Sequence, residues 1–358
     1  MNVAVDCRTL TIGWPSGRGH RFHVLWLRDN CPCGDCRHES GQRLLDTRSL
    51  PDDLELVDAS VDGSVRVSFT DGHVSSFDAD WLLSFASPDG PDRRRRLWGA
   101  ELQDELPTAR YADVAGGGAS LRDWLAAVDE LGFAVLTGCG TERGMVTRVA
   151  ELFGYVRETN YGRLFDVKTV VNPTNLAYTG LGLGAHTDNP YRDPAPTLQL
   201  LHCLASSADG GENTLVDGFR VSQDLPLEDF ELLSGCAIVF RYSDADTELE
   251  TETPVIVADV RGDVQSVHYN TRSAQAFRLP DDMVGEYYEA YQRFGRMLEA
   301  PEYRIQLKLA PGDLFIVDNL RVLHGRTGYA SSGGERHLQG CYADRDGLRS
   351  KLAVLSRG

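Results

Sequence analysis

Short hydrophobic runs broken by turn residues dominate the first 85 residues of the chain. Asp62-Gly63 and Asp71-Gly72 favour tight hairpin turns, because both positions of such a dipeptide accept a positive φ. The pattern therefore predicts a small β meander. A polar stretch from Ser87, SPDGPDRRRRLWG, is typical of a connector. The strand-like runs are residues 54–60, 65–69 and 74–77.

The hydrophobic pattern changes after the connector. Apolar residues at helical spacing predict helices around residues 121–128, 146–153 and 284–298, and residues 133–136 indicate a buried strand. From about Thr197 the chain becomes a series of strand-like runs with turn signals between them. Many strands with flanking helices predict a mainly β fold, a double-stranded β-helix or jelly roll. The runs are TLQLLHCL, ENTLVDGF, CAIVFRY, TPVIVADV, IQLKLAPGDLFIVDNLRVLHG and RHLQGCYAD.

Length and composition bound the organisation of the chain. Its 358 residues predict two unequal domains, a small N-terminal β domain over residues 1–90 and a larger domain over 91–358. We find neither a long apolar span nor a signal-peptide pattern, so we expect a cytoplasmic protein. The net charge of −17 argues against nucleic acid and against anionic membranes as partners.

The residues with the most chemical content are His186, Asp188 and His324. Two residues apart on a strand, His186 and Asp188 point to the same face. His324 follows the strand-like run LFIVDNLRVL, which can deliver a second imidazole to the same barrel interior. Two histidines and one carboxylate hold non-haem Fe(II) on one face and leave the opposite face open for a co-substrate and O₂. We therefore predict an iron site.

An arginine twelve residues after His324 extends this prediction. Arg336 begins the run RHLQGCY, where its guanidinium can bind the far carboxylate of 2-oxoglutarate through two hydrogen bonds. Thr214 follows the Gly210-Gly211 turn and is placed to donate a hydroxyl to the same carboxylate. His202, in an apolar strand, and His337, next to Arg336, are better interpreted as hydrogen-bonded histidines than as ligands.

Three of the eight cysteines crowd into Cys31-Pro32-Cys33-Gly34-Asp35-Cys36. In a reducing compartment such a cluster indicates metal ligands or reactive thiols, not disulfides. The spacing Cys-x-Cys-x₂-Cys alone leaves both interpretations open. The scattered cysteines are expected to be buried small side chains.

Several separated motifs resemble the γ-butyrobetaine dioxygenase family, Fe(II)- and 2-oxoglutarate-dependent hydroxylases of the wider taurine-dioxygenase group. They are AHTDNPYRDPAPTLQLLHCL, GGENTLVDGF, DNLRVLHGR, RHLQGCYAD, WLRDNCPCGDC and FDADWL. The resemblance spans nearly the whole chain. It implies a homodimer and an amino-terminal zinc site, for which the matching residues are Cys31, Cys33, Cys36 and His73.

The resemblance also implies a substrate pocket. Aromatic side chains that would surround a trimethylammonium group match Tyr161, Phe165, Tyr178 and Tyr342. Phe165 departs from the family pattern, in which a Trp is common, and a Phe face attracts cations less strongly. Asn175 and Asn270 match positions that hold the substrate's carboxylate, and Arg272 either adds a positive charge there or faces solvent.

We therefore expect hydroxylation of a small trimethylammonium substrate, with γ-butyrobetaine, the precursor of L-carnitine, as the first choice. The alternatives are a trimethylammonium phosphonate, for which Arg272 would be a suitable addition, and trimethyllysine, whose α-amino group would require an acidic partner. A hypothesis of another class is a non-enzymatic, metal-stabilised interaction module.

Overall fold

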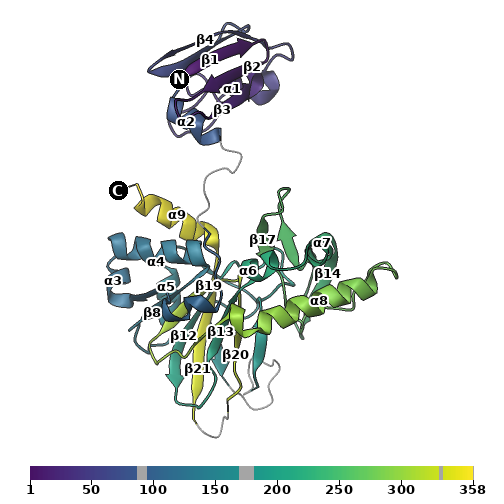
Figure 1. The fold of residues 1–358 in the computed structure, drawn as a ribbon. Coiled ribbons are helices and arrows are strands. Elements are labelled where there is room, and N and C mark those ends of the chain that lie inside the picture. Colours follow the sequence, from purple (N-terminus) through teal and green to yellow (C-terminus); the bar gives the residue numbers. More distant parts are fainter. Residues whose placement is uncertain (87–94, 169–180, 330–333, 358) are drawn as a thin grey trace. The chain divides into compact units, whose positions relative to one another are not determined.

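The computed structural model describes residues 1–86, 95–168, 181–329 and 334–357. The chain divides into two compact units, Met1–Arg93 and Arg94–Gly358 (Figure 1). Asn175, Tyr178 and most of the expected connector lie outside the described residues. Within the described residues, no helix has the length and apolarity needed to cross a bilayer.

The Met1–Arg93 unit contains two three-stranded antiparallel sheets, β1-β2-β3 and β4-β5-β6. Gly63 and Gly72 have φ values of 66° and 80°, as expected for the hairpin turns predicted from their dipeptides. Two helices were not predicted; α2 begins where the carboxylate of Asp78 accepts a hydrogen bond from the Trp81 backbone N–H (2.8 Å). The elements are β1 (Asn2–Asp6), β2 (Thr9–Gly13), β3 (Gly19–His23), α1 (Val24–Asp29), η1 (Thr47–Ser49), β4 (Leu56–Asp62), β5 (Ser64–Phe69), β6 (Val74–Phe77) and α2 (Ala79–Phe85).

A seven-stranded sheet forms one wall of the Arg94–Gly358 unit, in the order β10-β21-β12-β19-β8-β7, with β9 also paired to β21. Its pairs are antiparallel except for β7 with β8. The strands are β7 (Thr108–Arg110), β8 (Phe133–Thr137), β9 (Val156–Arg157), β10 (Phe165–Lys168), β12 (Leu198–Ser206), β19 (Leu314–Asp318) and β21 (Arg336–Ala343).

A four-stranded sheet in the order β11-β20-β13-β18 forms the opposite wall. Side chains of both sheets, among them Leu201 and Phe315 from one and Leu215 and Ile305 from the other, share one buried core. These two facing sheets confirm the predicted double-stranded β-helix. The strands are β11 (Leu183–His186), β13 (Asn213–Asp217), β18 (Arg304–Leu307) and β20 (Val322–Arg326).

Helices cover the outer faces of the two sheets (Figure 1). One apolar cluster joins α4, α5 and α9 to the larger sheet, and a second joins α6, α7 and α8 to the smaller one. The run ENTLVDGF is only partly a strand, because Asp217 caps a helix that begins at Gly218. The run TPVIVADV is divided between two hairpins, β14-β15 and β16-β17.

The remaining elements of this unit are two strand pairs, β14-β15 and β16-β17, and the flanking helices. They are η2 (Ala100–Asp104), α3 (Tyr111–Ala115), α4 (Gly118–Leu131), α5 (Met145–Ala150), α6 (Gly218–Gln223), α7 (Leu227–Gly235), β14 (Ala237–Ser243), β15 (Glu248–Pro254), β16 (Ile256–Ala258), β17 (Val264–Val267), α8 (Val284–Glu299), η4 (Pro301–Tyr303) and α9 (Arg345–Leu355).

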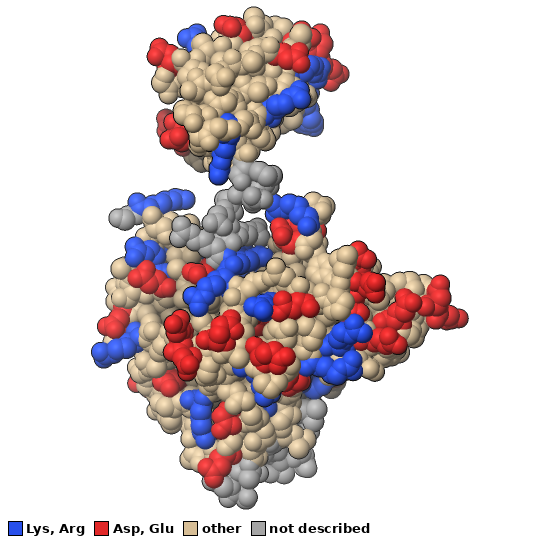
Figure 2. Space-filling view, viewed as in Figure 1, with Lys and Arg blue, Asp and Glu red and all other residues tan. Residues whose placement is uncertain are grey.

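Acidic and basic side chains are interspersed on the face of the Arg94–Gly358 unit that Figure 2 shows. On that face the described residues form no continuous basic surface. The expectation that nucleic acid is not a partner stays a prediction from the net charge.

Candidate active site

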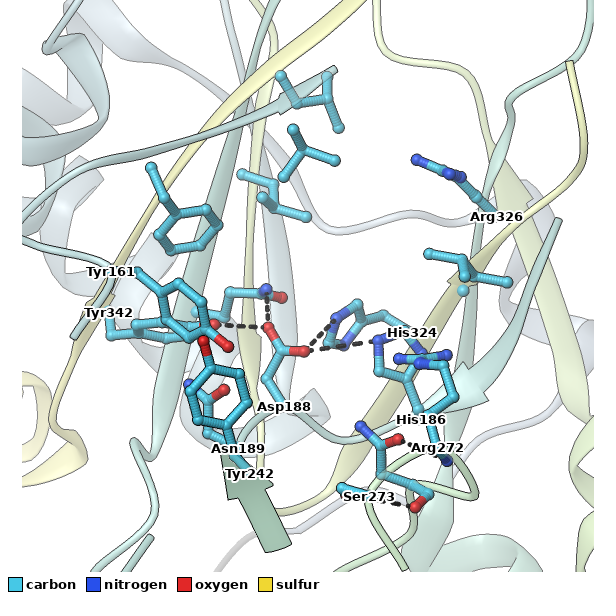
Figure 3. Close-up of a pocket in the computed structure, with 18 of the residues that line it drawn as sticks. Tyr161, His186, Asp188, Asn189, Tyr242, Arg272, Ser273, His324, Arg326 and Tyr342 are labelled. Atoms are coloured by element: carbon cyan, nitrogen blue, oxygen red, sulfur yellow. Dashed lines mark hydrogen bonds and ion pairs between the residues drawn. The ribbon is translucent and has the colours of Figure 1, made fainter. Parts of the chain in front are cut away.

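Two paired strands bring the predicted iron ligands together. His186 ends β11 and pairs directly with His324 of β20, so both imidazoles lie on the same face of the smaller sheet. Their ring centroids are 4.6 Å apart. Oδ1 of Asp188 lies 3.5 Å from Nε2 of His186 and 3.8 Å from Nε2 of His324 (Figure 3). The three donor atoms lie within 4.8 Å of one another, an arrangement that fits one metal ion.

Buried hydrogen bonds fix the backbone between the ligands. The Asp188 N–H donates to Oδ1 of Asn319 (2.7 Å), and Nδ2 of Asn319 donates to the Asp188 carbonyl (2.9 Å). The Thr187 N–H donates to the Tyr269 carbonyl (2.8 Å), while the Tyr269 N–H donates to Oγ1 of Thr187 (3.0 Å). The segment that carries His186 and Asp188 is therefore held from two sides.

The protonation states suit metal binding. Burial and the neighbouring His186 lower the pKa of His324 to about 3, so its imidazole is neutral at physiological pH. Burial opposes ionisation of Asp188, but its interactions with His186, His324 and Tyr342 outweigh that effect and hold its pKa below the ordinary value. Neutral imidazoles and an ionised carboxylate are the ligand forms a divalent cation requires.

A cavity of about 510 Å³ opens beside these three residues, within the usual range for small-molecule sites. Apolar side chains such as Leu201, Phe315 and Leu338 line one part of it. Four arginines also line it: Arg241, Arg272, Arg326 and Arg336. Arg241 is paired with Glu248 (2.5 Å). Such a cavity suits a ligand with carboxylate groups and an aliphatic body.

Arg336 carries a buried donor that no acceptor of the described residues meets. Its Nε donates to the Gly211 carbonyl (2.9 Å) and its Nη2 to Oδ1 of Asn213 (2.9 Å). Its Nη1 is buried and has no hydrogen-bond partner among the described residues. Because a buried unpaired guanidinium nitrogen is costly, this atom indicates an anionic ligand in the cavity. The residues present therefore fit the carboxylate of 2-oxoglutarate.

Thr214 does not lie where the sequence prediction placed it. On β13, Leu215 pairs with His324 and Thr214 pairs with Gly325, so Thr214 faces away from the side that carries the imidazole. It is buried but does not line the cavity. The neighbouring Asn213 lines the cavity and contacts Arg336. The prediction selected the wrong residue of this strand because it identified the segment but not its register.

Aromatic side chains form another wall of the cavity. The rings of Tyr161 and Phe165 have centroids 6.4 Å apart, and those of Phe165 and Tyr342 5.0 Å apart. Two tyrosines that sequence reasoning missed add to this wall: Tyr242, 5.8 Å from Tyr161, and Tyr191, 5.1 Å from Tyr242. Three predicted aromatic residues thus lie together, and the fourth, Tyr178, lies outside the described residues.

Asn270 and Arg272 line the cavity near Thr187, but they differ in how their side chains are engaged. Nδ2 of Asn270 donates to the Thr187 carbonyl (3.1 Å), and its Oδ1 accepts from the Arg272 N–H (3.1 Å). Asn270 therefore supports the metal-ligand segment. Arg272 is exposed as a residue, burial of its guanidinium lowers its pKa, and it makes no ion pair with a described residue. Arg272 is the better candidate of the two for binding an anionic group.

The two histidines that were not expected to bind metal, His202 and His337, make hydrogen bonds instead. Nε2 of His202 is 2.8 Å from the Gly140 carbonyl oxygen, and Nε2 of His337 is 2.7 Å from Oδ1 of Asp166.

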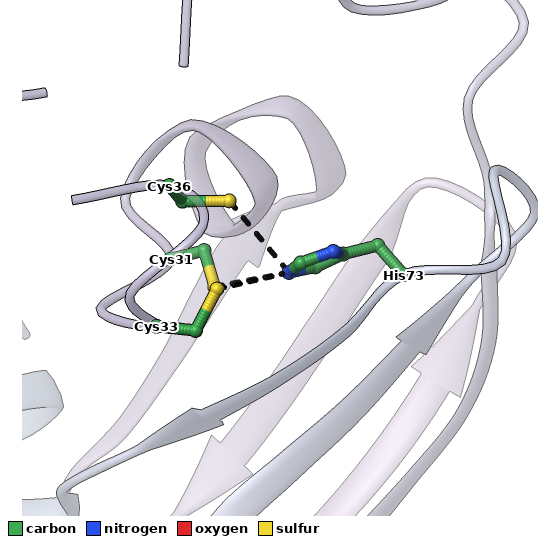
Figure 4. Close-up of side chains that lie close together, drawn as sticks. All are labelled: Cys31, Cys33, Cys36 and His73. Carbon is green, nitrogen blue, oxygen red and sulfur yellow. Dashed lines mark hydrogen bonds between the residues drawn. The ribbon is translucent and has the colours of Figure 1, made fainter. Parts of the chain in front are cut away.

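The amino-terminal unit holds a second set of metal donors (Figure 4). Nε2 of His73 lies 3.2 Å from Sγ of Cys31 and 3.7 Å from Sγ of both Cys33 and Cys36. A tetrahedral zinc ion separates sulfur and nitrogen ligands by about 3.5 Å, so the four side chains fit zinc. Burial raises the pKa of the Cys31 thiol to about 11. A bound cation is what would keep that sulfur ionised.

Replacing Cys36 by Ser is expected to release most of the zinc and to destabilise the amino-terminal unit, because one of four ligands is lost. A loss of even 1 kcal/mol lowers the unfolding temperature of a domain this small by about 4–8 °C. Zinc release to a chromogenic chelator and calorimetry measure both effects. Cys7→Ser is the matched control, since Cys7 is an exposed cysteine of the same unit. Equal zinc content in the two variants would contradict the zinc assignment.

Two family models together match most of the chain. Residues 91–342 match the model for the taurine catabolism dioxygenase TauD, TfdA family. Residues 1–83 match the model described as gamma-butyrobetaine hydroxylase-like, N-terminal.

The chain is also similar to named enzymes over nearly its full length. It is 35% identical to the gamma-butyrobetaine dioxygenase of Pseudomonas sp. (strain AK-1), over 97% of this chain and 94% of that protein. It is 32% identical to the human gamma-butyrobetaine dioxygenase over the same shares. With the mitochondrial trimethyllysine dioxygenase of Bos taurus it shares 31% identity over 94% of this chain and 83% of that protein.

Solved structures agree with the fold. An asparagine oxygenase in complex with Fe(II), hydroxyasparagine and succinate aligns with a TM-score of 0.53 at 20% identity, over 64% of this chain and 81% of that one. The non-heme iron oxygenase OrfP aligns with a TM-score of 0.51 at 17% identity, over 71% and 88%. At these identities the likeness concerns the fold alone.

A double-stranded β-helix with two histidines and a carboxylate at one cavity defines a 2-oxoglutarate-dependent, non-haem iron dioxygenase. The family model makes the assignment specific: the chain belongs to the taurine catabolism dioxygenase TauD, TfdA family. The resemblance found in the sequence is thereby confirmed, and the non-enzymatic module is not supported.

Proposed function

We propose that this protein hydroxylates a small trimethylammonium substrate in a reaction that uses Fe(II), 2-oxoglutarate and O₂, with γ-butyrobetaine as the substrate and L-carnitine as the product. The observation that carries the proposal is the aromatic wall of Tyr161, Phe165 and Tyr342 in the same cavity as the metal donors. The identity to gamma-butyrobetaine dioxygenases supports it.

Each part of the cavity has a distinct task in this proposal. Bound iron and 2-oxoglutarate supply the oxidising chemistry, in which O₂ inserts one oxygen atom into a C–H bond while 2-oxoglutarate becomes succinate and CO₂. Arg336 binds the far carboxylate of 2-oxoglutarate. The aromatic faces bind the ammonium group through their quadrupoles. Leu201, Phe315 and Leu338 exclude water from the reacting carbon.

The cavity disfavours trimethyllysine. Its α-ammonium group would require a carboxylate, and among the described residues that line the cavity the one carboxylate is Asp188. Asp188 already faces the two imidazoles. The trimethylammonium phosphonate stays the second candidate, because Arg272, which makes no ion pair with a described residue, would favour a doubly negative group over a carboxylate.

A comparison of substrates tests the proposal. Succinate release above the substrate-free background is expected with γ-butyrobetaine and not with trimethyllysine. The carbon isostere 5,5-dimethylhexanoate, whose tert-butyl head group is uncharged, should bind about 10-fold more weakly, since cation–π contacts contribute roughly 1–2 kcal/mol. Tyr161→Leu should remove much of this preference, whereas Tyr161→Phe keeps a ring and should retain it.

Two results would contradict the assignment. Faster turnover of 2-trimethylaminoethylphosphonate than of γ-butyrobetaine would assign the phosphonate as the substrate. Equal binding of γ-butyrobetaine and 5,5-dimethylhexanoate would contradict the cation-binding role of the aromatic wall. The homodimer and the cytoplasmic location stay predictions from the sequence.

A further inference from the structure

We propose that Gln199 and Tyr342 occupy the second carboxylate oxygen of Asp188 and thereby restrict this ligand to binding the metal through one oxygen. The proposal deepens the proposed function and rests on it, because it concerns the metal that the function requires. It makes Gln199 a positioning residue, and it gives Tyr342 a second task besides its place in the aromatic wall.

The two oxygens of Asp188 face different surroundings. Oδ1 lies toward the imidazoles of His186 and His324, at 3.5 Å and 3.8 Å from their Nε2 atoms. Oδ2 accepts a hydrogen bond from the Tyr342 hydroxyl (2.8 Å) and another from Nε2 of Gln199. Figure 3 shows the carboxylate between the histidines on one side and Tyr342 on the other. One oxygen is thus available to a metal and the other is held by protein donors.

Both donors come from the larger sheet and are fixed by strand pairing. Gln199 of β12 pairs directly with Tyr342 of β21, so their side chains emerge from the same face next to each other. Gln199 is 3% exposed and Tyr342 4% exposed, so water does not compete for these hydrogen bonds. Oε1 of Gln199 is buried without a partner among the described residues. The amide is therefore held in place through its donor, which contacts Asp188.

Binding of Asp188 through one oxygen leaves coordination positions of the metal open. A metal held by two imidazoles and one carboxylate oxygen keeps an open face for co-substrate and O₂. If Asp188 bound through both oxygens, it would occupy one of those open positions. Hydrogen bonds to Oδ2 oppose that change, because the metal would compete with two buried donors for the lone pairs of this oxygen.

Tyr342 also connects this arrangement to the substrate side of the cavity. Its ring lies 5.0 Å from that of Phe165, while its hydroxyl contacts Asp188. A residue that only formed the aromatic wall would not affect the metal in the absence of substrate. The two roles can therefore be separated by experiment.

Mn(II) is a suitable probe, because it prefers carboxylate and imidazole to thiolate ligands and so avoids the cysteine cluster. With substrate and 2-oxoglutarate absent and Mn(II) at saturation, line broadening of its EPR signal by ¹⁷O-labelled water counts the bound water molecules. Gln199→Met and Tyr342→Phe are each expected to lose one bound water relative to the wild-type protein, because Asp188 then binds through both oxygens.

Matched controls remove the same groups elsewhere. Tyr161→Phe deletes a hydroxyl that contacts Tyr191, and Gln339→Met deletes a buried amide that contacts Asp166. Both should keep the wild-type number of bound waters. Circular dichroism establishes that each variant is folded. Because Gln199→Met and Tyr342→Phe lie on different strands, one variant still tests the proposal if the other does not fold.

Two outcomes distinguish failure of this proposal from failure of the proposed function. An unchanged water count in both Gln199→Met and Tyr342→Phe, with Mn(II) binding abolished by His186→Ala, would overturn the role of the two donors alone. Equal Mn(II) binding by the wild-type protein and His186→Ala would remove the metal site, and both proposals with it.

Discussion

The His324→Ala variant is expected to lose succinate formation by roughly a thousand-fold or more, because a metal that loses one of three ligands is bound weakly and in the wrong geometry. His324 is nearly fully buried on β20 and is held beside His186 by direct pairing of their strands. Nothing else among the described residues offers a replacement imidazole at this position. Anaerobic titration with Fe(II), read out by metal content after desalting, measures the loss of binding independently of turnover.

His337→Ala is the matched control for this change. It also removes an imidazole from the same unit, but His337 contacts Asp166 on the opposite face of β21 from Arg336 and Tyr342. It should keep metal binding. Full succinate formation by His324→Ala would show that the reaction does not depend on this triad.

Replacing Arg336 by Met is expected to raise the KM for 2-oxoglutarate by about 100-fold or more, since breaking a buried charge pair costs about 2–5 kcal/mol. The guanidinium is held by Gly211 and Asn213, which leaves Nη1 as the donor for a ligand. Arg336→Lys restores the charge but not the planar guanidinium that Gly211 and Asn213 orient, so it should recover the affinity only in part.

Fe(II) affinity provides the control for Arg336→Met. Arg336 is not one of the metal donors, so Fe(II) binding without 2-oxoglutarate should change little. An unchanged KM for 2-oxoglutarate would overturn the assignment of Arg336. An equal loss of Fe(II) binding would instead indicate that the variant has lost the fold of the site.

Much of the fold could be predicted from local signals in the sequence. The hairpins at Gly63 and Gly72 depend on turn chemistry within two residues, and the helix around 121–128 depends on a regular apolar spacing. Helices α1, α2, α3, α6, α7 and α9 were missed. The apolar spacing of α7 is weak, and α2 lies in a region whose β pattern dominated the interpretation.

The site was predictable where chemistry and spacing coincide. A His-x-Asp pair with a distant His needs only the residue types, and the structure places the three together. Thr214 shows the limit, because a one-residue error in strand register moves a side chain to the other face. Tyr242 reaches the cavity through tertiary packing of the β14-β15 hairpin, and no local pattern marks it.

The reciprocal hydrogen bonds between Thr187 and Tyr269 have a consequence for the length of acceptable substrates. They tie the segment that carries the metal ligands to the segment that continues to Arg272. The metal ligands and the backbone of Arg272 therefore stand at a fixed separation. In the proposed binding mode, with the acid group of the substrate at Arg272, a substrate that is one methylene shorter or longer would present a different carbon to the metal. We expect such homologues to be hydroxylated at a different carbon or not at all.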